Sequence, residues 1–208
     1  MKTDPKEFYT ERIPAQFGEA LRRQAELSAT DDSEATRILE EMRAVNATLR
    51  VIVQGEGGNT FHLNIAAGEA EASDSPAQEP FMTIIHDRAA LEALVRESGD
   101  SALGFLGGMA GLAGEMKLTS GRIANLADLD GSIGLELTGE NGFQLVSHFG
   151  PGPIPDEPNC TIRIDGSVYD EIRSGALPAQ EAFMTGRIEI EGDMQMAMQL
   201  ALAALSPD

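Results

Sequence analysis

The run of residues 175–194 constrains the fold more than any other part of the chain. Gly175 follows the apolar positions of a predicted helix and suits the left-handed conformation in which many helices end. Pro178 fits the first position of a further helix, because its missing N–H has no partner there. Residues 187–191 alternate polar and apolar side chains, which predicts a strand buried on one face. Asp193 is then predicted to cap a last helix.

This order of elements resembles the C-terminal end of the type-two sterol carrier protein family, whose members are small lipid-carrier domains. The resemblance is clearest over residues 158–202 and loose upstream of them. The positions that carry it keep a fixed spacing and are Gly175, Pro178, Gln180, Ala182, Phe183, Met184, Gly186, Ile188, Ile190, Gly192, Asp193 and Met194. It implies an α+β fold, in which helices cover a twisted, mainly antiparallel sheet and leave a hydrophobic tunnel.

The resemblance also implies a function and a site. Members of the family bind fatty acids, fatty acyl-CoA, phospholipids or sterols, and they have no catalytic residues. Gln180 would then contact a polar head group, and the apolar part of the tunnel would be lined by Phe183, Met184, Met194 and Met198. Selectivity would follow the length and width of the ligand, because each buried methylene contributes about 0.8 kcal/mol.

The last helix is rich in methionine, and two interpretations of it stay open. Met194, Met198 and Leu202 share one helical face. Unbranched thioether side chains adapt to ligands of varied shape, but they also fill ordinary cores. The family resemblance favours the ligand site. Phe105 and Met109, in the glycine-rich stretch 104–114, form a second apolar surface that a lipid could use, although close helix packing also explains this stretch.

Two stretches of the chain share one order of predicted elements. A strand, a glycine-rich turn, a second strand, a loop, a third strand and a helix occur after residue 47 and again after residue 131. This predicts an N-terminal helical segment (1–46), a degenerate sterol-carrier-like copy (47–129) and a second copy with the family signature (130–208). The alternative is a single enlarged sheet. Prolines disfavour a central strand in residues 150–158, so the first copy is expected to complete the second sheet.

Charge and hydropathy exclude several classes of partner. The formal net charge of −19 disfavours nucleic acid, because phosphate binding needs a basic surface. The same charge disfavours adsorption to anionic membranes. Acidity either maintains solubility or serves to dock a basic protein. We expect no secretory signal, no transmembrane segment and a cytoplasmic location, since the chain has neither an apolar leader nor an eighteen-residue apolar run.

The sequence contains no motif for catalysis, metal or cofactor binding. The three histidines, His62, His86 and His148, lack the spacing of a metal site. Cys160 lies in an apolar strand pattern and is expected to be a buried small hydrophobe. The leading hypothesis is therefore a non-enzymatic carrier of a lipid or acyl chain, without a cofactor. The alternatives are a protein-interaction module with a filled tunnel and an acidic docking surface, and an enzyme that acts on a hydrophobic substrate. A protein partner and a homodimer are further expectations.

Overall fold

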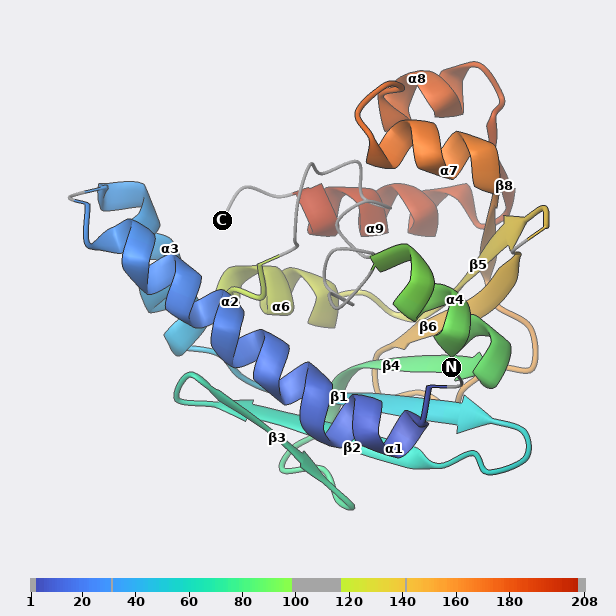
Figure 1. Cartoon of the computed structure of the whole chain (residues 1–208). Coiled ribbons are helices and arrows are strands. Elements are labelled where there is room, and N and C mark those ends of the chain that lie inside the picture. Colours follow the sequence, from blue (N-terminus) through green and yellow to red (C-terminus); the bar gives the residue numbers. More distant parts are fainter. Residues whose placement is uncertain (1–2, 31, 99–116, 141, 206–208) are drawn as a thin grey trace.

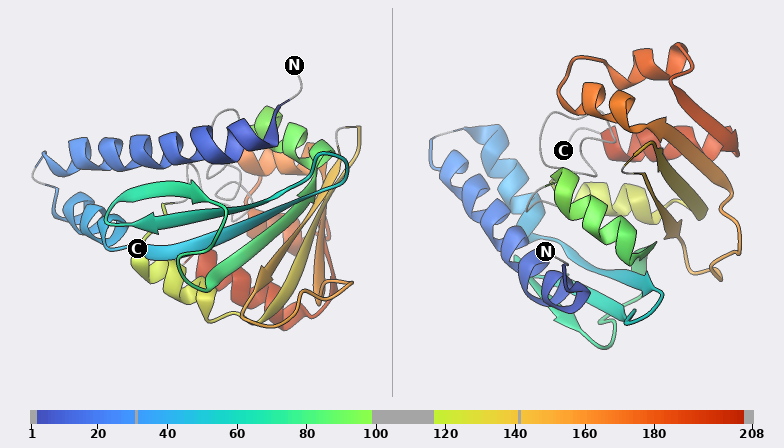
Figure 2. Two further views of the ribbon diagram at one scale, coloured as in Figure 1. Left: turned by 90° about the horizontal axis from the view of Figure 1, so that it is seen from below. Right: turned by 45° about the vertical axis from the view of Figure 1, so that its right-hand side comes forward.

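A computed structural model describes residues 3–30, 32–98, 117–140 and 142–205. The chain begins with helices, namely α1 (Pro5–Glu7), the π-helix η1 (Phe8–Arg12), α2 (Ile13–Ser28) and α3 (Ser33–Arg43). Asp32 starts α3, because its carboxylate accepts hydrogen bonds from the backbone N–H groups of Glu34 and Ala35. α2 packs alongside both α3 and β3 (Figure 2).

Eight strands form one sheet. They are β1 (Asn46–Gln54), β2 (Thr60–Ala66), β3 (Glu69–Ser73), β4 (Pro80–Asp87), β5 (Gly131–Thr138), β6 (Phe143–Phe149), β7 (Cys160–Asp165) and β8 (Ile188–Gly192). Their order across the sheet is β3-β2-β1-β4-β6-β5-β7-β8. β1 and β4 are parallel, as are β5 and β7, and the other neighbouring pairs are antiparallel. The predicted fold class, a mainly antiparallel sheet with helices, is confirmed.

The remaining helices connect or follow these strands. They are α4 (Arg88–Ser98), α6 (Ser120–Ala127), α7 (Gly166–Arg173), α8 (Ala179–Met184) and α9 (Met194–Leu205). Figure 1 shows the sheet bending from β1–β3 at the bottom of the view to β5 and β8 at its right, with the helices on the inner side. Among the described residues, no helix is both long and apolar enough to cross a bilayer.

The two halves of the sheet have the same strand order. β2-β1-β4 in the first half and β6-β5-β7 in the second each consist of an antiparallel hairpin and a parallel third strand. Residues 150–158 form no strand, and β4 of the first half pairs with β6 instead, as expected from the prolines. The two copies and the domain boundaries stay predictions, because a shared strand order does not establish duplication and one sheet runs across residue 130.

The register gives the two faces of the sheet different characters. One face carries side chains that join the apolar clusters beneath the helices, for example Val51 on β1, Leu135 on β5 and Ile164 on β7. The opposite face carries polar residues at many of the alternate positions, among them Arg50 and Arg163, together with a small apolar group of Ile52, Ile85 and Val146. The helices and the hydrophobic core therefore lie on one side of the sheet.

Candidate functional site

The segment with the family signature folds as its sequence indicates. Gly175 ends α7 with a φ of 75°, and its N–H donates to the carbonyl oxygen of Ile172. Pro178 differs slightly from expectation, since it is the N-cap of α8 and not its first helical residue. Asp193 caps α9 by accepting from the N–H groups of Gln195 and Met196.

An ion pair ties the α7–α8 hairpin to the start of β8. Both terminal nitrogens of Arg187 donate to the Glu171 carboxylate, at 2.8 and 2.7 Å. This bidentate contact holds the pKa of Glu171 below its usual range and raises the pKa of Arg187. The ion pair thus links α7 to the residue that precedes β8, on either side of α8 in the sequence, and α8 carries three of the predicted site residues.

α9 buries one face and exposes another that is also apolar. Met196, Ala197 and Ala203 pack into the main core cluster, which also contains Cys160. Met194, Met198 and Leu202 lie on the other face, and Met198 and Leu202 are 60% and 67% exposed. The structure thus brings these three predicted site residues together as one stripe along α9, with spacing i, i+4, i+8.

α8 places the other predicted residues at the surface. Ala182 is completely buried and anchors the helix in the cluster beneath α7. Phe183, Met184 and Gln180 are exposed, Met184 to 76%. Phe105 and Met109 lie outside the described residues.

The exposed apolar residues are concentrated in these two helices. Among the described residues, the large hydrophobic side chains that are exposed are Leu27, Phe183, Met184, Met194, Met198 and Leu202. Only Leu27 lies elsewhere, on α2. An apolar surface of this kind is typical of a site that contacts a hydrophobic ligand or partner.

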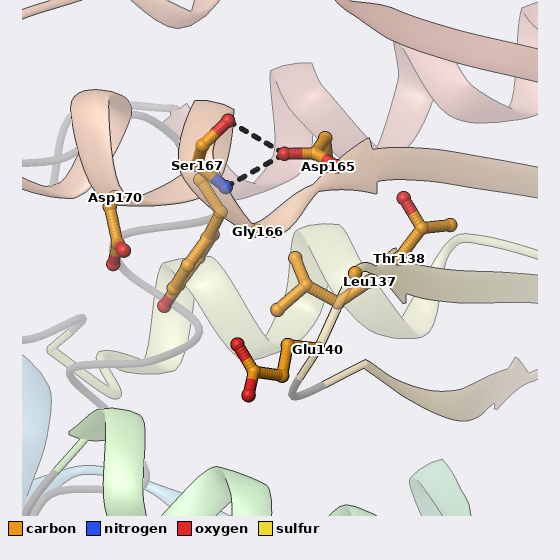
Figure 3. Close-up of a pocket in the computed structure, with 9 residues that line it drawn as sticks. Leu137, Thr138, Glu140, Asp165, Gly166, Ser167 and Asp170 are labelled. Carbon is orange, nitrogen blue, oxygen red and sulfur yellow. Dashed lines mark hydrogen bonds between the residues drawn. The ribbon is translucent and has the colours of Figure 1, made fainter.

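A separate pocket of about 320 Å³ opens where β5 and β7 end and α7 begins (Figure 3). Glu140, Asp165 and Asp170 are among the residues that line it. Asp165 accepts hydrogen bonds from the hydroxyl and N–H of Ser167, which lower its pKa. The acidic side chains that line this pocket disfavour both an anion and an alkyl chain. Asp165 is moreover the N-cap of α7, so its carboxylate already takes the place that an anion would occupy at the N-terminus of this helix.

The titratable groups of the described residues form no evident catalytic or metal centre. No group of three or more His, Cys, Asp or Glu side chains among them could hold a metal ion. Ser132 Oγ lies 2.9 Å from Nδ1 of His148, but both residues are buried, and Nε2 of His148 contacts the carbonyl oxygen of Gly152. Cys160 is fully buried as expected, and burial raises the pKa of its thiol, which disfavours the nucleophilic thiolate form.

Comparison with known protein families gives a match for the C-terminal part of the chain. Residues 119–204 match the model of the SCP-2 sterol transfer family. No curated protein matches the chain significantly.

Three solved structures are similar to parts of the chain. Palmitated SCP2L2 from Aedes aegypti is 20% identical over 37% of this chain and 74% of that protein, with a TM-score of 0.31. Sterol carrier protein 2 from Yarrowia lipolytica, in its apo form, is 19% identical over 34% of this chain and 68% of its own, with a TM-score of 0.26. The sterol carrier protein domain 2 of Helicoverpa armigera is 21% identical over 56% of this chain and 84% of its own, also with a TM-score of 0.26.

The family model spans α6 to α9, which includes the predicted signature and both helices with exposed apolar residues. The resemblance to the SCP-2 sterol transfer family that the sequence predicts is therefore confirmed over residues 119–204.

Proposed function

We propose that this chain binds and carries a lipid or an acyl chain without chemically altering it. The observation that carries the proposal is the apolar stripe of Met194, Met198 and Leu202, which α9 leaves exposed within the family-matched region. Water contact with this stripe is unfavourable, and an alkyl chain that covered it would gain about 0.8 kcal/mol per buried methylene.

Phe183 and Met184 on α8 would extend the apolar contact, and Gln180 would bind the polar end of the ligand. Phe105 and Met109 remain candidates for ligand contact, because their side chains are apolar. Methionine suits such a site, because its flexible thioether adapts to ligands of different width. The proposal includes a tunnel enclosed by these residues and a cytoplasmic location.

Polar substitution of the exposed stripe tests the site without disturbing the core. In the double variant Met198→Gln/Leu202→Gln, the affinity for a fluorescent fatty acid should fall roughly tenfold, since two apolar contacts are lost. Leu27→Gln is the matched control, because Leu27 is also exposed (54%) but lies on α2, and this variant should bind as the wild type does. Equal affinities in all three proteins would show that the stripe is not the binding site.

Native mass spectrometry of the gently purified chain tests the function itself. A copurifying lipid is expected. If no lipid copurifies and no fatty-acid or sterol probe binds, the carrier function is wrong, and the stripe then serves contact with a protein or a second copy of the chain. Turnover of acyl-CoA would instead indicate an enzyme.

A further inference from the structure

The polar face of the sheet carries a row of side chains that the proposed lipid function does not use. Six residues from six adjacent strands are aligned in register across it: Ser73, His62, Arg50, Thr83, His148 and Ser132. Residues directly opposite each other on paired strands point to the same face. The row therefore brings one arginine and two histidines together, with no acidic member, in a chain whose net charge is −19.

Arg50 is the centre of this row and is half-buried. Its Nε donates to Thr83 Oγ1 at 2.9 Å. Within the described part of the chain, no carboxylate pairs with its guanidinium, and its terminal nitrogens make no hydrogen bond. An arginine without a carboxylate partner is unexpected in a protein with 34 acidic and 15 basic residues, because acidic side chains outnumber basic ones.

Arg163, on the same face, shows the contrast. It lies 2.9 Å from Glu136, 3.6 Å from Glu189 and 3.8 Å from Glu191. Its charge is compensated by three carboxylates, whereas that of Arg50 is compensated by none of the described residues.

His62 lies opposite Arg50 on β2, and its imidazole has a nitrogen without a hydrogen-bond partner among the described residues. Its side chain is only 9% exposed, and its buried Nδ1 has no hydrogen-bond partner among the described residues. Buried polar atoms are normally paired, so an isolated one beside an uncompensated arginine points to a missing partner. Glu71, two positions from Ser73 on the edge strand β3, is exposed, and solvent screens its charge.

We propose that Arg50 and His62 form an anion site that binds a phosphate or carboxylate group on the polar face of the sheet. The planar fork of a guanidinium matches the two oxygens of either group, and an imidazole nitrogen can complete the contact. The site does not depend on the lipid-binding proposal, because α9 and the apolar core lie on the other face of the sheet.

Nuclear magnetic resonance of the imidazole signals tests this site in the full chain. Inorganic phosphate, added at constant pH and ionic strength, should shift the signal of His62 in a saturable way. A parallel titration with vesicles that contain phosphatidic acid distinguishes the source of the anion. A response to free phosphate indicates a small soluble ligand, and a response to the vesicles alone indicates a lipid head group. If neither probe shifts the His62 signal, the proposal is wrong.

Variants identify the residue responsible. Arg50→Gln should weaken phosphate binding at least tenfold, and Arg50→Lys should have a smaller effect because it keeps the charge but loses the fork. Arg22→Gln is the charge-matched control, since Arg22 is an exposed arginine on α2, and its affinity for phosphate should stay within twofold of the wild type. An Arg50→Gln or Arg50→Lys protein that folds and still binds phosphate as tightly as the Arg22→Gln protein would overturn the site. Fatty-acid binding should be unchanged in both Arg50 variants, which separates this proposal from the lipid function.

Discussion

The phenol oxygen of Tyr9 lies 2.5 Å from Nε2 of His86, and this contact joins the N-terminal π-helix to β4 inside the core. Nδ1 of His86 lies 2.7 Å from the carbonyl oxygen of Asp87, which can only accept. Nδ1 therefore carries the proton, Nε2 accepts, and Tyr9 donates. Burial raises the pKa of Tyr9, which keeps the phenol protonated.

Removing this donor should destabilise the fold. Tyr9→Phe keeps the ring contacts with Phe8 and Phe61 but leaves Nε2 of His86 buried without a partner. The free energy of unfolding should fall by roughly 1–3 kcal/mol in urea denaturation. In a double-mutant cycle with His86→Leu, the Tyr9→Phe cost should nearly disappear; an undiminished cost would mean that the two residues are not coupled.

Stability should decrease as the pH falls through about 6.5. Burial lowers the pKa of His86 below its ordinary value, and the backbone contact with Asp87 only partly opposes this. Below pH 6.5 the unfolded chain therefore binds a proton at this residue that the folded chain does not, so the folded state loses its advantage. The free energy of unfolding, measured from pH 7.5 to 5.5, should fall more steeply in the wild type than in His86→Gln. Identical slopes would exclude His86 as the cause.

Truncation to alanine should lower the free energy of unfolding at one methionine of α9 and leave it almost unchanged at another. Met196 is 4% exposed in the core, and Met196→Ala should cost roughly 2–5 kcal/mol by leaving a cavity. Met198, half a turn further along, is exposed, and Met198→Ala should change stability by no more than about 0.5 kcal/mol. Thermal or urea unfolding compares them directly. A large loss in Met198→Ala would show that its side chain is packed in solution.

Two glycines with positive φ should differ in the cost of an added methyl group. Gly192 has a φ of 90°, and a Cβ there would lie 2.4 Å from the carbonyl oxygen of Asn159. Gly175 has a φ of 75° but has open space around it, so Gly175→Ala should cost roughly 1–2 kcal/mol through backbone strain alone. Gly192→Ala should cost more, because β8 must also shift away from Asn159. Equal unfolding free energies of the two variants would contradict the predicted clash.

Local elements of this fold could be read from the chain, because their signals are short-range. The turn after Gly175, the strand Ile188–Gly192 and the cap at Asp193 each depend on a few neighbouring residues, and each is present. Pro178 differs from its predicted position by one residue, and the strand, predicted over 187–191, is shifted by one residue. The family model confirmed the resemblance of the C-terminal part. The sequence could reveal this resemblance because the spacing of short motifs is kept even when overall identity is low.

The exposed face of α9 could not be read from the chain. Ten of its twelve residues are Met, Ala or Leu, so an apolar residue occupies almost every position around the helix. Periodicity then gives no preferred face. Only packing against Cys160 and the rest of the core selects Met196 for burial and leaves Met198 outside.

The chain by itself therefore determined the local elements of residues 175–194 and the resemblance of its C-terminal part to the SCP-2 sterol transfer family. Tertiary structure alone decided that the strands of both halves join in one sheet through the β4–β6 pair, and that Arg50 and His62 face each other. The physical reason is that hydrophobic periodicity reports whether a residue is buried, whereas strand register reports which distant residues it meets. That information lies in contacts between segments far apart in the sequence.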